Sequence, residues 1–325
     1  MNEFTVPSFP EIFSALSDMH FFYDRKKRLL LPNYEAVEQT WNNLLACPMD
    51  TAHHTIISTN AQISAICSSW RYSGDCWCIQ NGIASNIQDY IKALVSESLT
   101  LLQDSSMAFV QAWFNPHNRI VNKMCGQGTL LYDDAGVYVD STFCLHWEPA
   151  VGSVSDTYWV DSLGAANAVD FRDFIIDNRS RIIYDSEDFA TDPLLASMDA
   201  LFSKSRLRRR RSIDIIHAGD RIQAIVISCH SSPGISFSFL ENRTEIIVGK
   251  GVDRTPSLLS AIGEVARGQV PPGAIPRPVI TDGRTGNALI RHCGATLWRE
   301  YTRRIWTKEA YQALYDYITN KYCQT

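Results

Sequence analysis

The residues best suited to bind phosphate lie in the sequence GKGVDRTP, which begins at Gly249. Gly249 and Gly251 would let a phosphate approach the backbone closely, and Lys250 and Arg254 would neutralise its charge. Thr255 followed by proline is a typical start of a helix, where free N–H groups bind anions. We therefore predict a cofactor phosphate site at these five residues. The alternative is a glycine-rich loop that only caps a helix.

The densest charge in the chain is the sequence RLRRRR at residues 206–211. Guanidinium groups pair with phosphates and stack on purines. The run falls between an expected helix and an expected strand, a connection that often borders a cleft. We predict that Arg208, Arg209, Arg210 and Arg211 contact a phosphate-bearing ligand, either a nucleotide or a nucleic acid. The alternative is a solvated charged face, because arginine is mostly exposed in folded proteins.

Two further groups have the chemistry of zinc ligands, His53-His54 and the pair Cys76 and Cys78. Alternate residues of a strand share one face, so the two cysteines also fit a packed core. No second Cys or His pair follows at the spacing of a zinc finger. We predict no metal site.

The elements that would position these residues follow a plan that occurs twice. Markers recur in the same order, and three of the pairs keep the same spacing: Tyr23 with Tyr184, Pro32 with Pro193, Trp41 with Phe202, and Cys125-Gly126 with Cys293-Gly294. Between them, β-branched and aromatic residues predict strands at 55–58, 63–67, 76–80, 213–216, 222–227 and 235–240. Apolar periodicity predicts helices at 87–102, 168–178 and 258–266.

The chain has 325 residues, of which 45% are hydrophobic, enough apolar material for two cores. Glycine, serine and proline interrupt the regular patterns near residues 150–168. We therefore expect an α/β (α+β) protein with two domains, residues 1–160 and 161–325. Each domain would be a mixed, mostly antiparallel sheet flanked by helices.

This order of elements resembles that of the GNAT superfamily of N-acyltransferases, in which a meander leads into a helix that holds the pyrophosphate of acyl-CoA. Asn287–Gly294, followed by Trp298, Tyr301 and Trp306, is similar to the last helix and final strands of that family. The segment 82–88 lacks the glycine pair of the family's phosphate turn. The resemblance therefore favours the second copy, with the loop at Gly249, as the site for acyl-CoA.

The resemblance implies transfer of an acyl group from acyl-CoA, such as acetyl-CoA, to the amine of a small molecule or a peptide. Such a transfer needs a base for the ammonium and an acid for the leaving thiolate. In the family a tyrosine near the last helix often serves as the acid, and Tyr301 is the matching candidate, with Cys293 just before it. Glu241 is the candidate base. The alternative is a structural role for all three residues.

The remaining features exclude several classes of protein. The chain has no Walker loop, nucleophile elbow, dinucleotide fingerprint or HExxH motif. Nine scattered cysteines, no apolar run of membrane-spanning length and no leader pattern predict a cytoplasmic protein without a membrane partner. Whether the chain is an active acyltransferase or a non-catalytic regulatory or binding module that uses the arginine run stays open, as does its oligomeric state.

Overall fold

The structure, a computed structural model, describes residues 7–59, 62–129, 136–149, 157–269 and 277–323. The first half contains α1 (Phe9–Asp18), α2 (Asp24–Leu30), the 3₁₀ turn η1 (Leu31–Asn33), α3 (Tyr34–Leu45), β1 (Ala52–Thr59), β2 (Gln62–Arg71), β3 (Cys76–Ala84), α4 (Ile87–Gln103), β4 (Phe109–Phe114), α5 (Arg119–Thr129) and β5 (Val137–His146). The second half contains β6 (Trp159–Ser162), α6 (Ala168–Asn178), α7 (Arg181–Ser186), α8 (Ala196–Ser203), β7 (Arg209–Ala218), β8 (Arg221–Ser231), the 3₁₀ turn η3 (Leu240–Asn242), β9 (Thr244–Val248), α9 (Pro256–Gly268), β10 (Val279–Thr281), α10 (Gly283–Cys293), β11 (Thr296–Thr307) and α11 (Lys308–Tyr322).

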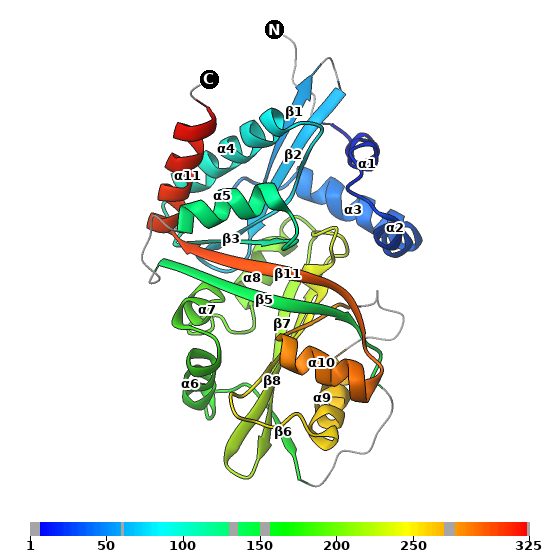
Figure 1. The fold of residues 1–325 in the computed structure, drawn as a ribbon, viewed down its shortest axis with the longest axis vertical. Coiled ribbons are helices and arrows are strands. Elements are labelled where there is room, and N and C mark those ends of the chain that lie inside the picture. The colour runs from blue at the N-terminus through cyan, green and yellow to red at the C-terminus, as the bar shows by residue number, and fades with distance from the viewer. Residues whose placement is uncertain (1–6, 60–61, 130–135, 150–156, 270–276, 324–325) are drawn as a thin grey trace.

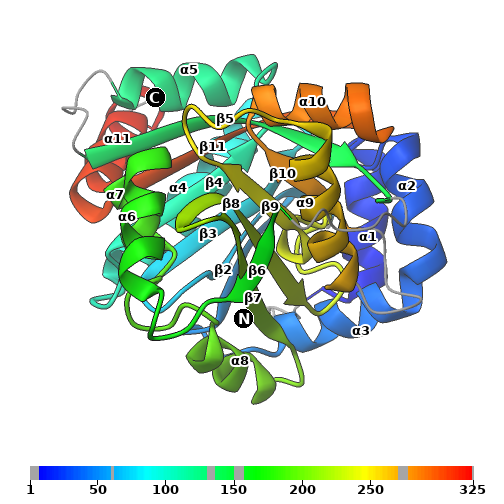
Figure 2. The same ribbon diagram turned by 90° about the horizontal axis from the view of Figure 1, so that it is seen from below.

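The described strands form a single sheet with the order β1-β2-β3-β4-β11-β5-β10-β9-β8-β7-β6. In the first half β1, β2 and β3 are antiparallel, and β3 pairs with β4 in parallel. The second half repeats this pattern, because β7, β8 and β9 are antiparallel and β9 pairs with β10 in parallel. Figure 2 shows α5 and α10 on one side of the strands and α3 and α8 on the other. The predicted fold class, a mixed sheet built twice and flanked by helices, is confirmed.

The two halves exchange their last strands. β11, from the end of the chain, pairs with β4 of the first half, and β5 of the first half pairs with β10. The two exchanged strands also pair with each other along most of their length, and they cross the middle of the molecule in Figure 1. A boundary at residue 160 therefore falls within β6 but does not divide the sheet, since each half of the sheet is completed by a strand from the other half of the chain. Residues 150–156 of the predicted boundary region lie outside the described residues.

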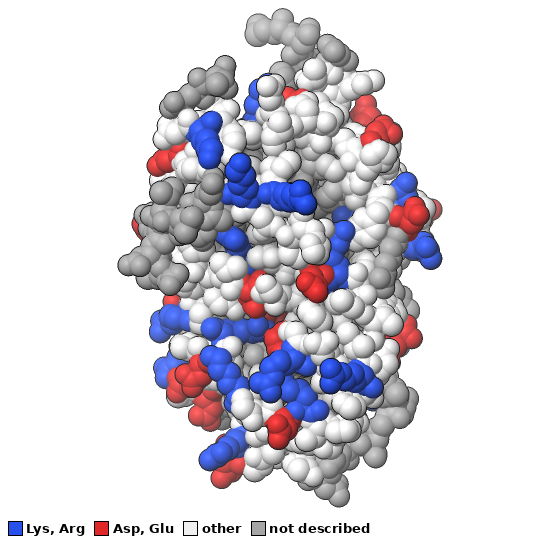
Figure 3. All heavy atoms as spheres, viewed as in Figure 1, with Lys and Arg blue, Asp and Glu red and all other residues white. Residues whose placement is uncertain are grey.

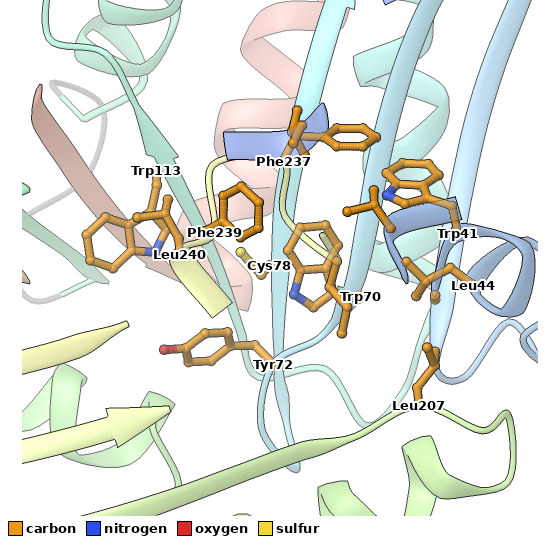
Figure 4. Close-up of a cluster of buried hydrophobic side chains, with 14 of the residues drawn as sticks. Trp41, Leu44, Trp70, Tyr72, Cys78, Trp113, Leu207, Phe237, Phe239 and Leu240 are labelled. Carbon is orange, nitrogen blue, oxygen red and sulfur yellow. The ribbon is translucent and has the colours of Figure 1, made fainter. Parts of the chain in front are cut away.

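The predicted strand at 235–240 is wrong. This segment is irregular and ends in η3, and the strand of the meander is β9, which begins at Thr244. The alternation that suggested a strand comes from Ile235, Phe237 and Phe239, whose side chains enter the core of the first half. Phe237 stacks on Trp41 of α3 with ring centroids 4.5 Å apart, and Figure 4 shows the two side chains together. Packing against another element, rather than pleating, produced the alternation.

The first half has a separate apolar core on each face of the sheet. One core joins α1, α2 and α3 to Trp70 and Trp113 of the strands, together with the segment that carries Phe237. The other joins α4, α5 and α11 to the opposite face, through residues such as Trp77 and Trp306. Two helix layers thus enclose the point where β3 and β4 meet.

Two further features concern the cysteines and the length of the helices. None of the nine cysteines forms a disulfide within the described residues. Within the described ranges, no helix combines the length and the apolar character needed to cross a membrane.

Candidate active site between strands β3 and β4

A cavity of about 600 Å³ lies where β3 and β4 separate in the first half. Pairing between these two parallel strands ends at Ile79 opposite Ala112. Beyond that pair, Gln80–Ser85 from β3 and Trp113–Asn115 from β4 both line the cavity. The cavity is therefore an opening in the sheet that reaches both helix layers.

A bulge in β3 shapes the edge of this opening. The register of β2 and β3 passes from Ser68 opposite Gln80 to Ile66 opposite Ile83, so Asn81 and Gly82 share one partner position. Asn81 has a φ of 57°, in the left-handed region that asparagine tolerates better than most residues. Its side chain is buried in the cavity wall, and its Nδ2 has no hydrogen-bond partner among the described residues. The bulge therefore presents an amide donor that no protein group satisfies.

One side of the cavity is the space between α4 and α5. Ser85 and Asn86 line it where α4 begins, and the Asn86 side chain caps that helix by accepting from the backbone N–H of Asp89 at 2.9 Å. The deeper wall is apolar and is formed by side chains of α4, α5 and α11: Tyr90, Leu94, Val121, Met124, Tyr311 and Leu314. This side can hold a long, mainly apolar ligand whose polar end lies at the start of α4.

The other side of the cavity is aromatic and basic. Phe21, Tyr23 and Lys26 come from the start of α2 and the turn before it, and Arg299 comes from β11. Lys26 is 3% exposed, and its Nζ lies 3.5 Å from the centroid of the Phe21 ring. Burial, and then the charge of Arg299, lower the pKa of the Lys26 amine well below its usual range. Two cations thus face a cavity whose described lining contains no aspartate or glutamate.

Tyr301 is the predicted catalytic residue that the structure places in the cavity. It lies on β11, so the strand exchange carries it from the second half into the first. Burial raises the pKa of the Tyr301 hydroxyl, while a side-chain hydrogen bond with Ser238, which also lines the cavity, opposes that rise. The hydroxyl therefore keeps its proton at neutral pH and can act as an acid.

Glu241, the predicted base, lies elsewhere. It is 1% exposed, does not line the cavity, and its carboxylate forms a buried ion pair with Arg209. A carboxylate held in such a pair is not available to take a proton from a substrate, so the predicted role is wrong. His20, which lines the cavity from the turn before α2, was not predicted.

The predicted arginine patch is also wrong as a continuous surface. Arg209 and Arg211 point into the molecule, where Arg211 pairs with Glu187 at 2.7 Å. Arg208 and Arg210 are exposed, and Arg210 pairs with Asp199 at 2.6 Å. Arg209, Arg210 and Arg211 begin β7, in which alternate residues face opposite sides. The basic side chains in the lower half of Figure 3 spread from the region of α6 and α7 to that of α10, with acidic side chains among them.

The glycine loop of the second half is held by its own contacts. The amine of Lys250 donates to the backbone of Asp177, and Arg254 donates to Thr285 at 3.3 Å. Thr255 caps α9 by accepting from the N–H of Leu258 at 3.2 Å. Gly249 and Gly251 belong to the same turn, with Gly251 at a φ of 78°. These contacts match the helix-capping alternative, and no residue of this loop lines the large cavity.

The described part of the second half differs from the first at the corresponding place. The register of β8 and β9 is continuous, without a bulge. Trp147, just after β5, packs between α9 and the end of α10: a Cβ on Gly263 would lie 3.1 Å from its ring, and its Nε1 donates to the Cys293 carbonyl at 3.2 Å. The space between the two helices is therefore filled by an indole, although the sequence favoured this half for acyl-CoA.

The other candidate residues have structural surroundings. Cys293 is half-buried at the end of α10, outside the large cavity, and burial raises the pKa of its thiol. Cys76 and Cys78 are buried in the α1–α3 core, and His53 pairs with Glu97 at 2.7 Å. Among the described residues, no group of three or more His, Cys, Asp or Glu side chains is arranged to hold a metal ion.

The known proteins to which this chain is similar are solved structures. No protein-family model and no curated protein matches the sequence. The structure is similar to a tandem GNAT protein from the clavulanic acid biosynthesis pathway, with 8% identity and a TM-score of 0.41 over 83% of this chain and 88% of that one. It is also similar to a GCN5-related N-acetyltransferase from Sphaerobacter thermophilus, with 11% identity and a TM-score of 0.40 over 80% of this chain and 81% of that one. A third similar structure is a GCN5-related N-acetyltransferase-like protein from Streptococcus suis 89/1591, with 9% identity and a TM-score of 0.41 over 84% of this chain and 99% of that one.

Sequence identities of 8–11% bear on the fold alone, so any chemistry has to be argued from the residues of this chain. Sequence reasoning missed Lys26, Asn81 and Arg299 as cavity residues. Asn81-Gly82 at the end of a strand pattern was a usable sign of a bulge. Lys26 and Arg299 carried no local sign, because only the exchanged β11 brings them together.

Proposed function

We propose that the protein is an acyl-CoA-dependent N-acyltransferase whose reaction takes place in the first half, in the cavity between β3 and β4. The observation that carries this proposal is the opening through the sheet, which joins a long apolar channel on one face to a polar, basic chamber on the other. Acyl transfer between two large substrates needs such an arrangement, since the donor and the acceptor must approach one carbon atom from different directions.

The donor thioester would lie between α4 and α5, with its phosphates toward the start of α4. Free N–H groups at the N-terminus of a helix favour negative charge, and α4 begins at the cavity. The apolar wall from Tyr90 to Leu314 suits the chain that joins the phosphates to the thioester. The acceptor amine would enter from the side of Phe21, Tyr23 and Arg299.

In the reaction, the amine nitrogen attacks the thioester carbonyl carbon, a C–N bond forms and the C–S bond breaks. The Asn81 Nδ2 is the available donor for the carbonyl oxygen as it gains negative charge. The Tyr301 hydroxyl gives its proton to the departing thiolate. The proton lost by the ammonium passes to His20, which takes the place that the sequence assigned to Glu241. The attacking nitrogen loses its second proton to solvent as the amide forms, and Tyr301 regains a proton from solvent.

The test is release of free CoA thiol from acetyl-CoA, followed with a thiol reagent in the presence of a panel of amines. We expect amine-dependent thiol release that His20→Asn lowers, while His117→Asn, an exposed histidine outside the cavity lining, leaves it unchanged. Thiol release that no amine raises above hydrolysis, with acetyl-CoA or a longer acyl-CoA, would count against the proposal.

A further inference from the structure

The acceptor side of the cavity contains two basic side chains that no carboxylate of the described chain pairs with. Lys26 and Arg299 both line it, and neither forms an ion pair with a carboxylate in the described part of the chain. Elsewhere the interior pairs its buried cations: Arg209 with Glu241, Arg211 with Glu187, and Arg243 with Glu245. Among the described residues, Lys26 is the only fully buried cationic side chain without a carboxylate partner, and it lies where a substrate would bind.

Burying an ammonium without a partner is costly, which is why the pKa of Lys26 is lowered, and an anion bound beside it would favour the charged form again. Lys26 is almost completely buried, and its Nζ lies over the rings of Phe21 and Phe22. Arg299 lies over the Tyr23 ring, with its guanidinium carbon 4.6 Å from the ring centroid, and 6.0 Å from that of Tyr301. The rings hold both cations in place without cancelling their charge.

We propose that this chamber is an oxyanion subsite, and that the acceptor is an amine that also carries a carboxylate or a phosphate. Only the identification of the bound molecule as the acyl acceptor rests on the proposed function, and the anion site itself does not. The guanidinium and the ammonium donate to the anion, while Phe21 and Tyr23 contact the apolar part of the same molecule. The subsite lies on the opposite face of the sheet from α4, so it is separate from the place assigned to the phosphates of the donor.

The alternation of side chains along β11 supports this placement of Arg299. Tyr301 packs in the core formed with α1, α2 and α3, and Trp306 packs in the core formed with α4, α5 and α11. Residues 299 and 301 lie on the same face of the strand, because side chains alternate. Arg299 therefore faces the acceptor chamber rather than the donor channel. An anion fixed there would orient the amine of the same molecule toward the opening.

The experiment measures binding without any acyl donor, by isothermal titration calorimetry. The probes share one ring and differ in charge: phenylacetate, phenyl phosphate and the neutral phenylacetamide. We expect one of the two anions to bind at least about tenfold more tightly than the amide, since a hydrogen bond to a charged group contributes about 1.5–3 kcal/mol. Which anion binds better identifies the oxyanion.

Lys26→Met and Arg299→Met should each reduce that preference about tenfold or more. Lys26→Met replaces an unpaired buried cation with an apolar chain against Phe21 and Phe22, so the variant should fold, which the thermal midpoint checks. Arg28→Met, an exposed position on the same helix, is the matched control and should keep the preference.

Equal affinity for the three probes, no binding of either anion at tens of millimolar, or an unchanged preference in both cavity variants would overturn the subsite. Anion binding combined with no binding of acetyl-CoA would keep the subsite and contradict the proposed transferase. Acetyl-CoA binding with no preference for an anion would contradict the subsite and leave the proposed transferase standing.

Discussion

Glu187 is the centre of a buried charge cluster that joins the two halves of the chain. Its carboxylate accepts from the Tyr72 hydroxyl of the first half at 2.9 Å, from Arg211 at 2.7 Å, and from Arg303 of β11. Burial alone would raise the pKa of Glu187, but the charges of Arg303, Arg243 and Arg211 outweigh it and lower the pKa to about 2, from an ordinary value of 4.5. The ionised carboxylate is therefore favoured by the folded state.

The difference in pKa gives the size of the effect. One pKa unit corresponds to about 1.4 kcal/mol, so the shift contributes on the order of 3 kcal/mol to the free energy of unfolding at neutral pH. Because the folded pKa lies below the unfolded one, this stabilisation is present above pH 4.5 and is lost as the pH falls toward 2. Glu187→Gln, which removes the carboxylate that Arg211, Arg243 and Arg303 share, should lose at least about 3 kcal/mol at pH 7.

Urea unfolding at several pH values between 7 and 3, followed by tryptophan fluorescence, measures this difference. The variant should lose the part of the acid dependence that Glu187 provides, so its deficit relative to the wild type should shrink as the pH falls. Glu300→Gln, an exposed carboxylate on β11, is the control and should change the stability by less than about 0.5 kcal/mol. A deficit below about 1 kcal/mol at pH 7, or one that does not depend on pH, would refute the reasoning.

Three other predictions concern Tyr301, Phe237 and the arginine run. Tyr301→Phe should lower kcat by about 10²- to 10⁴-fold with little change in acetyl-CoA affinity, because it removes the proton donor and keeps the ring; unchanged thiol release would exclude that role. Phe237→Ala should cost about 3–5 kcal/mol in urea unfolding, because the ring is fully buried in the core of the other half, and a loss under 1 kcal/mol would contradict that packing. Arg209→Met should cost about 3–5 kcal/mol by leaving Glu241 unpaired, whereas Arg210→Met should cost under about 1 kcal/mol; equal effects would mean that both side chains are at the surface.

Local patterns predicted the repeated elements well. The helix at 168–178 was predicted with the observed bounds, and the strands of the first meander were each found within longer strands. The marker pairs also hold in three dimensions, since Trp41 and Phe202 lie on corresponding helices, as do Cys125 and Cys293. Such features depend on a few neighbouring residues, which is why periodicity reveals them.

The site was harder to predict because its parts are far apart in the sequence. Lys26 and Arg299 meet only because β11 crosses into the first half, and no short pattern encodes that exchange. The arginine run misled for a related reason: a strand that is buried on one face can contain arginines when carboxylates such as Glu187 and Glu241 come from elsewhere. Tyr301 was chosen by family resemblance, and the strand exchange assigns it to the half that the sequence did not favour.

The proposed transferase has one acyl-CoA site per chain, in the first half between α4 and α5. The most direct measurement is the stoichiometry of acetyl-CoA binding by isothermal titration calorimetry, compared between two variants. Val121→Trp places an indole in the cavity from α5, whereas Ile290→Trp places one on α10, the corresponding helix of the second half. We expect one acetyl-CoA per chain for the wild type and for Ile290→Trp, and no measurable binding for Val121→Trp. Two sites per chain, or a loss of binding in Ile290→Trp alone, would contradict the account.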